Sequence, residues 1–227
     1  MSGRHFNGNL DPAFNPFADS YLSEILAAVV SAWSRMRPPE RREIEDKITR
    51  RLCGRLLNDQ YFADMPYDVS CQHSLLGLDG EYLGRLDLRF KHRHSHRDYF
   101  AFEAKRLHVR YPGGKVSPEY ITYAGEDGMM AFIAGQYSEG FRAGGMLGYV
   151  MDGDSSKAWD GLMKCIDERR NPLKLSPNSG LVKSALLVPV SPNLPVVPLG
   201  ETEHSLTAHK LRLLHLLLPV LSPRQIN

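Results

Sequence analysis

Cysteine is too scarce in this sequence to support a disulfide framework. Cys53, Cys71 and Cys165 are the only three among 227 residues, and no two of them are spaced as Cys-x-x-Cys. An odd and widely spaced set argues against a secreted disulfide-bonded fold and against a zinc knuckle. It favours a reducing compartment, and we therefore expect a cytoplasmic protein.

Long apolar runs are also lacking. No stretch approaches the ~18 apolar residues of a membrane span, so we expect no association with a membrane. Residues 1–17 are rich in Asn, Gly and Pro and contain no apolar signal core. They predict a flexible N-terminal arm. Residues 18–227 are predicted to form a single domain, because their number suits one sizeable core.

Neither a Walker-type phosphate loop nor a dinucleotide-binding glycine fingerprint occurs, which removes the common nucleotide-binding classes. A large excess of one charge is missing too, because the formal net charge is only +2. Local basic clusters suit contact with a phosphate backbone, and they equally suit a solvated surface. These clusters are Arg41–Arg42, Arg50–Arg51 with Arg55, and Lys91–Arg97.

What the sequence does contain is an alternation of helical and strand-like segments. Apolar residues at helical spacing predict helices over 18–36, 39–57, 128–141 and 157–169. The third of these is expected to be ended by Gly144–Gly145. The fourth is expected to be capped by Ser155 and to have Met163 among its inward-facing residues. Strands are predicted over 69–76, 82–90, 98–107, 146–151 and 181–190. The apolar segment 204–221 fits either a strand or a helix. This order predicts an α/β fold in which helices flank a mixed central sheet.

The segment from Glu81 to Leu107 reads as two strands joined by a basic loop. The first strand carries Asp87, and the second carries Glu103 and Lys105. Residues two apart on a strand face the same side, so Glu103 and Lys105 are predicted to project together. Two carboxylates beside a lysine can form a metal site with a charged neighbour. The same residues can also form a cross-strand ion pair on a wet sheet face, which is worth little energy.

An aspartate on one strand followed by Glu-x-Lys on the next resembles the PD-(D/E)XK nuclease superfamily, whose fold is restriction-endonuclease-like. The matching stretches are GRLDLRF around Asp87 and FAFEAKRL around Glu103 and Lys105, while Leu86 stands where the family name has a proline. The resemblance implies a Mg²⁺-dependent endonuclease, with Mn²⁺ as an alternative ion. Asp87, Glu103 and the carbonyl of Ala104 would hold the ion. Lys105 would orient or deprotonate the attacking water, or balance charge in the transition state.

The resemblance also implies two polar residues on helices. A glutamate before the strands often joins the metal site, and Glu45 is our candidate, with Glu43 as the alternative that is expected to point more to solvent. Both glutamates could instead form surface pairs one helical turn away. A polar residue on the helix after the Glu-x-Lys strand often supports the site, and Gln136 is the candidate. An exposed glutamine on an amphipathic helix is the competing interpretation of Gln136.

Three histidines alternate in the loop between the two strands: His92, His94 and His96. Alternating histidines can hold zinc, but Arg93 and Arg97 lie between and beside them and would repel a cation. A solvated or phosphate-facing loop is therefore the preferred interpretation.

The function implied by the resemblance is phosphodiester hydrolysis, with DNA as the favoured substrate and a bacterial defence or restriction system as the favoured context. An effector of this kind would fit a protein partner such as an ATPase or a sensor subunit. The alternative is a catalytically silent module of the same fold that binds nucleic acid or a partner protein. The sequence leaves open whether the substrate is DNA or RNA, its strandedness, and whether two copies form a homodimer.

Overall fold

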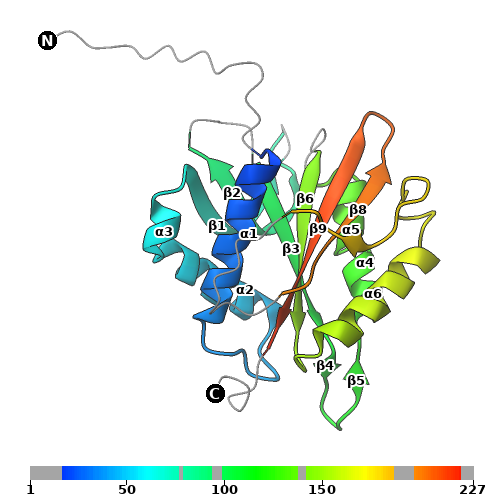
Figure 1. Ribbon diagram of the computed structural model, residues 1–227, viewed down its shortest axis with the longest axis horizontal. Coiled ribbons are helices and arrows are strands. Elements are labelled where there is room, and N and C mark those ends of the chain that lie inside the picture. The colour runs from blue at the N-terminus through cyan, green and yellow to red at the C-terminus, as the bar shows by residue number, and fades with distance from the viewer. Residues whose placement is uncertain (1–16, 77–78, 94–98, 138–141, 187–196, 221–227) are drawn as a thin grey trace, which may run out of the picture.

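The computed structural model describes residues 17–76, 79–93, 99–137, 142–186 and 197–220. They form an α/β fold around a mixed seven-stranded sheet with the order β1-β2-β3-β6-β9-β8-β7 (Figure 1). Strands β3, β6 and β9 are parallel, and the other neighbours are antiparallel. The strands are β1 (Tyr67–Leu76), β2 (Tyr82–His92), β3 (Tyr99–Leu107), β6 (Ala143–Val150), β7 (Val182–Lys183), β8 (Leu199–Ser205) and β9 (Lys210–Pro219). The predicted mixed sheet flanked by helices is confirmed.

Helices cover both faces of this sheet (Figure 1). One face carries α1 (Asp19–Ser34), α2 (Glu45–Leu57) and α3 (Gln60–Ala63), and the other carries α4 (Tyr120–Ala124), α5 (Met129–Ile133) and α6 (Ser155–Glu168). Each face has its own buried apolar cluster. One includes Ile48 and Leu52 of α2, and the other includes Leu162 and Ile166 of α6. A small hairpin of β4 (Val109–Arg110) and β5 (Val116–Ser117) projects beyond the end of β3 (Figure 1).

The central strands β6 and β9 are buried on both faces. Burial is continuous from Gly144 to Val150 in β6 and from Leu213 to Pro219 in β9. A strand covered on both sides is apolar at successive residues rather than at alternate ones. This is why periodicity alone did not decide the segment 204–221, whose described part, up to residue 220, contains the end of β8, a turn and β9.

Several predicted boundaries are wrong. Of the helix predicted over 128–141, the described part contains only α5, which ends at Ile133, after which Gly135 has a φ of +76°; residues 138–141 lie outside the described residues. Gly144–Gly145 do not end a helix but lie within β6, where a Cβ atom on Gly144 would come within 2.6 Å of Phe132. The helix after Pro38–Pro39 begins only at Glu45. The helices predicted over 39–57 and 128–141 were both too long, because apolar residues in the neighbouring turns continue the helical spacing.

The second half of the chain gives further corrections. Helix α6 starts at Ser155, and the capping role belongs to Asp154, whose carboxylate accepts a hydrogen bond from the Lys157 N–H at 3.0 Å. Met163, predicted to face inward, is 44% exposed. Of the strand predicted over 181–190, the described part contains only β7, and residues 187–196 lie outside the described residues.

The predicted arm over 1–17 lies outside the described residues except for Phe17, whose ring stacks on Tyr67 at 5.7 Å. The single domain over 18–227 stays a prediction. None of the helices in the described part of the chain is long and apolar enough to cross a membrane.

Candidate active site

The candidate site lies where β2 and β3 separate. The two strands pair from Lys91 and Tyr99 to Leu88 and Phe102, where the ladder ends. The next residue of β2 is Asp87, which is 4% exposed, and its Oδ2 accepts a hydrogen bond from the backbone N–H of Ala104 at 2.9 Å. The carboxylate thus replaces the backbone acceptor that a continued ladder would supply to β3.

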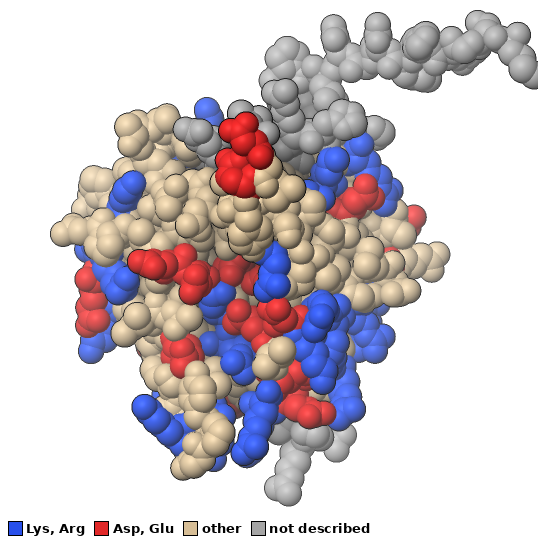
Figure 2. Space-filling view, turned by 180° about the vertical axis from the view of Figure 1, so that it is seen from behind, with Lys and Arg blue, Asp and Glu red and all other residues tan. Residues whose placement is uncertain are grey.

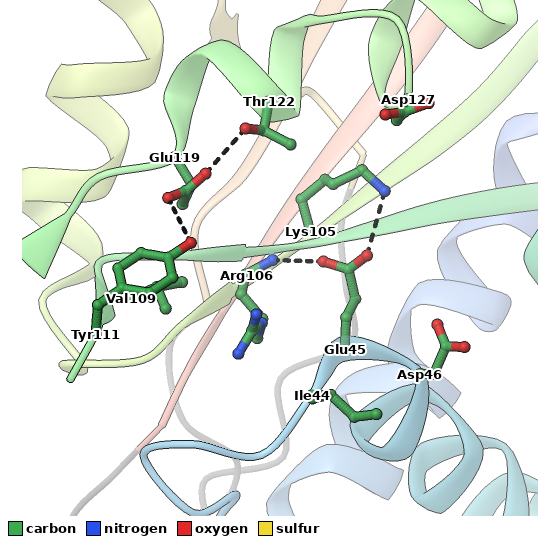
Figure 3. Close-up of a pocket in the computed structure, with 10 residues that line it drawn as sticks. All are labelled: Ile44, Glu45, Asp46, Lys105, Arg106, Val109, Tyr111, Glu119, Thr122 and Asp127. Atoms are coloured by element: carbon green, nitrogen blue, oxygen red, sulfur yellow. Dashed lines mark hydrogen bonds and ion pairs between the residues drawn. The ribbon is translucent and has the colours of Figure 1, made fainter.

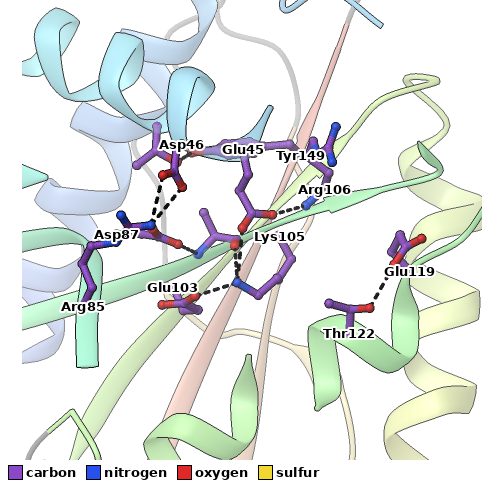
Figure 4. A network of polar contacts seen from close by, with 12 residues as sticks. Glu45, Asp46, Arg85, Asp87, Glu103, Lys105, Arg106, Glu119, Thr122 and Tyr149 are labelled. Atoms are coloured by element: carbon purple, nitrogen blue, oxygen red, sulfur yellow. Dashed lines mark hydrogen bonds and ion pairs between the residues drawn. The ribbon is translucent and has the colours of Figure 1, made fainter. Parts of the chain in front are cut away.

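Lys105 is the centre of the network (Figure 4). Glu103 and Lys105 project from the same face of β3, as the alternation predicted, and the ammonium of Lys105 lies 2.6 Å from Glu103 Oε1. The ammonium also donates to the carbonyl of Ala104 at 2.9 Å and to Glu45 Oε1 at 3.3 Å. These three acceptors come from β3 and from the start of α2.

Glu45 reaches the site because it is the first residue of α2. Its Oε2 accepts a hydrogen bond from the backbone N–H of Arg106 at 2.9 Å, which ties the helix to β3. Glu43 does not join this network, and it is not turned to solvent as expected. It is 6% exposed, and its carboxylate pairs with Arg51 at 2.8 Å. Of the two glutamates considered, the structure brings Glu45 to Lys105.

The site holds more carboxyl groups than cations. Burial raises the pKa of Glu103 to about 8, with a further rise from the charge of Asp87 and an opposing effect of Lys105. Burial also raises the pKa of Glu45, which Lys105 opposes and Asp87 reinforces. Burial alone would lower the pKa of Lys105, but the charges of Glu103 and Glu45 outweigh it and raise the pKa. Glu103 and Glu45 thus share one ammonium, which disfavours the ionised form of both glutamates together.

Two further residues reach the carboxylates and were not singled out from the sequence. Tyr137 donates a hydrogen bond from its hydroxyl to Glu103 Oε2 at 2.8 Å, and Gln72 donates one from Nε2 to Asp87 Oδ1 at 3.1 Å. Gln136 instead lies in the bend after α5 and is exposed. A buried tyrosine hydroxyl normally has a hydrogen-bond partner. The hydroxyl of Tyr137 was therefore the sequence signal that could have identified Tyr137, rather than Gln136, as the residue that contacts the site.

A groove opens beside Lys105 (Figure 3). Its volume is about 420 Å³. Tyr111 and Ile44, on the β4–β5 turn and just before α2, contribute apolar surface and are 43% and 57% exposed. The Tyr111 hydroxyl donates to Glu119 at 3.0 Å. The lining is more acidic than basic, with Lys105 and Arg106 against Glu45, Asp46, Glu119 and Asp127.

The surface charge beyond the groove is mixed. Figure 2 shows acidic and basic side chains interspersed over the lower half of one face. Within the predicted basic clusters, Arg51 is engaged by Glu43 and Arg93 pairs with Asp68, while Arg41 and Arg42 are exposed. Phosphate contacts would therefore depend on individual exposed arginines rather than on a uniformly basic face.

The histidine loop is described only in part. His92 is buried at the end of β2, with its ring edge-on to Tyr67 at 5.4 Å. His94 and His96 lie outside the described residues.

Three of the four groups expected to bind a metal ion contact Lys105, whereas Asp87 is held by Gln72 and by the N–H of Ala104. Glu103, the Ala104 carbonyl and Glu45 all accept hydrogen bonds from the ammonium of Lys105. This ammonium is the cation that these oxygens bind in the structure. Within the described residues, no three or more His, Cys, Asp or Glu side chains are arranged to hold a metal ion as they stand. The donor atoms are hard oxygens of the kind that Mg²⁺ and Mn²⁺ prefer, so their chemistry fits a divalent ion once the ammonium moves aside.

Comparison with known proteins adds no relative to this description: no protein-family model, no curated protein and no solved structure matches the chain.

Proposed function

We propose that this chain is a Mg²⁺-dependent nuclease with a restriction-endonuclease-like fold that hydrolyses phosphodiester bonds, with DNA as the favoured substrate. One observation carries the proposal: the ammonium of Lys105 lies among Glu103, the Ala104 carbonyl and Glu45, with Asp87 anchored on the N–H of the same Ala104. Two buried carboxylates, a lysine and a helix glutamate converge from three separate segments. A surface ion pair would need none of this convergence.

Asp87, Glu103 and the Ala104 carbonyl would hold the ion, which would supply charge neutralisation at a phosphate and lower the pKa of a bound water. Lys105 has a raised pKa and stays an ammonium. We therefore assign it to orienting the attacking water and balancing transition-state charge rather than to removing a proton. Glu45 holds Lys105 from the helix side, and Tyr137 fixes the second oxygen of Glu103 by its hydroxyl.

The groove beside Lys105 is the proposed entry for the phosphodiester backbone. Arg106 lines it, and exposed Arg41 and Arg42 can add non-specific contacts that weaken with salt. A role as an effector in a bacterial defence or restriction system, with an ATPase or sensor partner or as a homodimer, belongs to the same proposal.

A catalytically silent module that binds nucleic acid or a protein is the second candidate. One observation favours it: both oxygens of Asp87 and both of Glu103 already accept hydrogen bonds from the chain itself. An ion can enter only if some of these bonds are exchanged.

Cleavage of plasmid DNA separates the two candidates. The purified chain is incubated with Mg²⁺, Mn²⁺ or EDTA beside Lys105→Ala, with Lys164→Ala as the matched control, because Lys164 is an exposed lysine paired only loosely with Glu168 at 3.9 Å. A nuclease gives metal-dependent nicking that Lys105→Ala abolishes and Lys164→Ala retains. No cleavage of plasmid, single strands or RNA in either metal would refute the proposal and leave the silent module. Nicking that survives in Lys105→Ala would refute the assignment of cleavage to this site.

A further inference from the structure

The pairing of β1 with β2 is interrupted at one position, and that position faces Asp87. From Tyr67 opposite His92 to Leu75 opposite Gly84, every residue of β1 has a partner except Gln72. Continuing the register across the gap places Gln72 opposite Asp87, because Cys71 pairs with Leu88 on one side and the register resumes unshifted on the other. Gln72 has a φ of 55°, in the left-handed region that non-glycine residues adopt rarely.

Both strands change faces at this pair. On β2, Leu88 packs in the cluster under α1 and α2, whereas Leu86, two residues away, packs in the cluster under α4 to α6. On β1, Cys71 packs against the first cluster and Leu75 against the second. Regular alternation would keep residues two or four apart on one face. The left-handed backbone at Gln72 therefore accompanies a local rotation of the two strands.

The side chain of Gln72 uses this rotation to reach Asp87. Its Nε2 donates to Asp87 Oδ1 at 3.1 Å, while the N–H of Ala104 donates to Oδ2 at 2.9 Å. Both oxygens of the carboxylate are thereby oriented by neutral donors. The Oε1 atom of Gln72 is buried and has no hydrogen-bond partner among the described residues. A buried acceptor without a partner is uncommon in a residue that serves only packing.

We propose that Gln72 is a positioning residue of the nuclease site, which holds the Asp87 carboxylate in the orientation that a divalent ion requires. This inference rests on the proposed function. A left-handed conformation in the interior of a strand persists when the surrounding structure imposes it, and such outliers gather at functional sites. The left-handed backbone at Gln72 brings its side chain within hydrogen-bond distance of Asp87. The unpartnered Oε1 would be able to accept a hydrogen bond from a water molecule bound at the site.

Two pairs of variants separate strain from positioning. Gln72→Gly and Gln72→Ala both remove the carboxamide, but only glycine adopts a φ of 55° without steric cost. Ser74→Gly and Ser74→Ala are the matched controls, because Ser74 lies on the same strand and pairs regularly with Arg85. The measurements are the melting temperature by calorimetry and the affinity for Mn²⁺ by titration calorimetry.

We expect Gln72→Gly to melt at a higher temperature than Gln72→Ala, and Ser74→Gly to melt at a lower temperature than Ser74→Ala. Both Gln72 variants should bind Mn²⁺ about 10-fold more weakly or worse, which is the usual effect of losing a group that orients a metal ligand. Mn²⁺ affinity should be unchanged in the Ser74 variants. An unchanged Mn²⁺ affinity in both Gln72 variants, or the ordinary order of alanine above glycine at position 72, would overturn the inference.

Failure of the proposed function gives a different result. A chain that binds no Mn²⁺ even before substitution refutes the metal-dependent nuclease. The role of Gln72 is then decided by a crystal structure of Gln72→Ala. An Asp87 side chain that leaves the N–H of Ala104 supports positioning by Gln72, and an Asp87 side chain that stays in place overturns it.

Discussion

Replacing Lys105 by methionine removes the ammonium that contacts both Glu103 and Glu45 while keeping a side chain of similar length. The side chains of Lys105 and Glu103 are only 9% and 7% exposed, so water cannot replace the lost charge. Removing one partner of a buried ion pair typically costs about 3–5 kcal/mol. Because Glu103 can take up a proton, we expect the lower end, about 3 kcal/mol, at pH 9 and less at pH 6. For a chain of this length this corresponds to a fall in melting temperature of roughly 6–12 °C.

Denaturant unfolding followed by circular dichroism measures this loss directly. Lys164→Met is the control, since the Lys164–Glu168 pair is 78% and 65% exposed and should contribute less than about 1 kcal/mol. The double variant Lys105→Met/Glu103→Gln should recover part of the stability, because it removes the uncompensated carboxylate. Mn²⁺ should raise the melting temperature of Lys105→Met more than that of the unaltered chain. A free energy of unfolding equal to that of the Lys164→Met control, or a double variant less stable than Lys105→Met alone, would refute this account of the charge balance.

Three further predictions concern individual hydrogen bonds and titrations. The pKa of Glu103 is raised from 4.5 to about 8 in the fold, so the folded chain binds the extra proton and its stability should fall as the pH rises from about 4.5 to about 8; Glu103→Gln should flatten this slope in unfolding curves recorded across that range. Tyr137→Phe removes a hydrogen bond that lowers the pKa of Glu103. The acid limb of the cleavage–pH profile should therefore move to higher pH in this variant. Tyr61→Phe, at an exposed tyrosine, should leave the acid limb in place. The Thr202 hydroxyl lies between His204 and His215, at 2.7 and 2.9 Å from their Nε2 atoms. Thr202→Val should therefore lower the free energy of unfolding by about 3 kcal/mol, whereas Thr207→Val in the exposed turn should leave it unchanged.

The same buried chain of hydrogen bonds fixes two histidine tautomers. His204 Nδ1 lies 2.6 Å from the carbonyl of Leu173, which can only accept, so Nδ1 carries the proton. Burial lowers the pKa of both histidines, that of His215 to about 3, so both are neutral. His204 Nε2 therefore accepts from Thr202, whose oxygen accepts from His215 Nε2–H. The remaining His215 Nδ1 accepts from the Tyr123 hydroxyl at 3.0 Å. Nitrogen chemical shifts of the two imidazoles check this assignment.

The parts of the site that follow from local alternation could be predicted, and the parts that depend on irregular backbone could not. Glu103 and Lys105 share a face of β3 simply because they are two apart on a regular strand. Gln72 reaches Asp87 only through a left-handed residue inside β1, which strand propensity disfavours. Tyr137 reaches Glu103 because α5 stops at Ile133, whereas helical spacing in the sequence continued to Phe141.

Glu45 and Glu43 show a third kind of limit. Both precede the apolar stripe of α2, and their spacing does not tell which one meets the sheet. The difference arises from tertiary partners. The guanidinium of Arg51, nearly two turns into α2, binds the carboxylate of Glu43, and the backbone of β3 presents the Arg106 N–H to Glu45. Which of two neighbouring carboxylates reaches a site thus depends on where the helix begins relative to the sheet, and periodicity locates that start only to within a few residues.

The charge balance links the stability of the free chain to the chemistry that we propose. Lys105 neutralises the oxygens of Glu103, Ala104 and Glu45 as long as no other cation does so. A divalent ion held by Asp87, Glu103 and the Ala104 carbonyl would displace the ammonium from the last two of these groups, and Glu45 would remain its acceptor. The ammonium would then have N–H donors free for a phosphate oxygen or for the attacking water that we propose. The ammonium that holds Glu103 and Glu45 together in the free chain is therefore the group that would supply positive charge for catalysis.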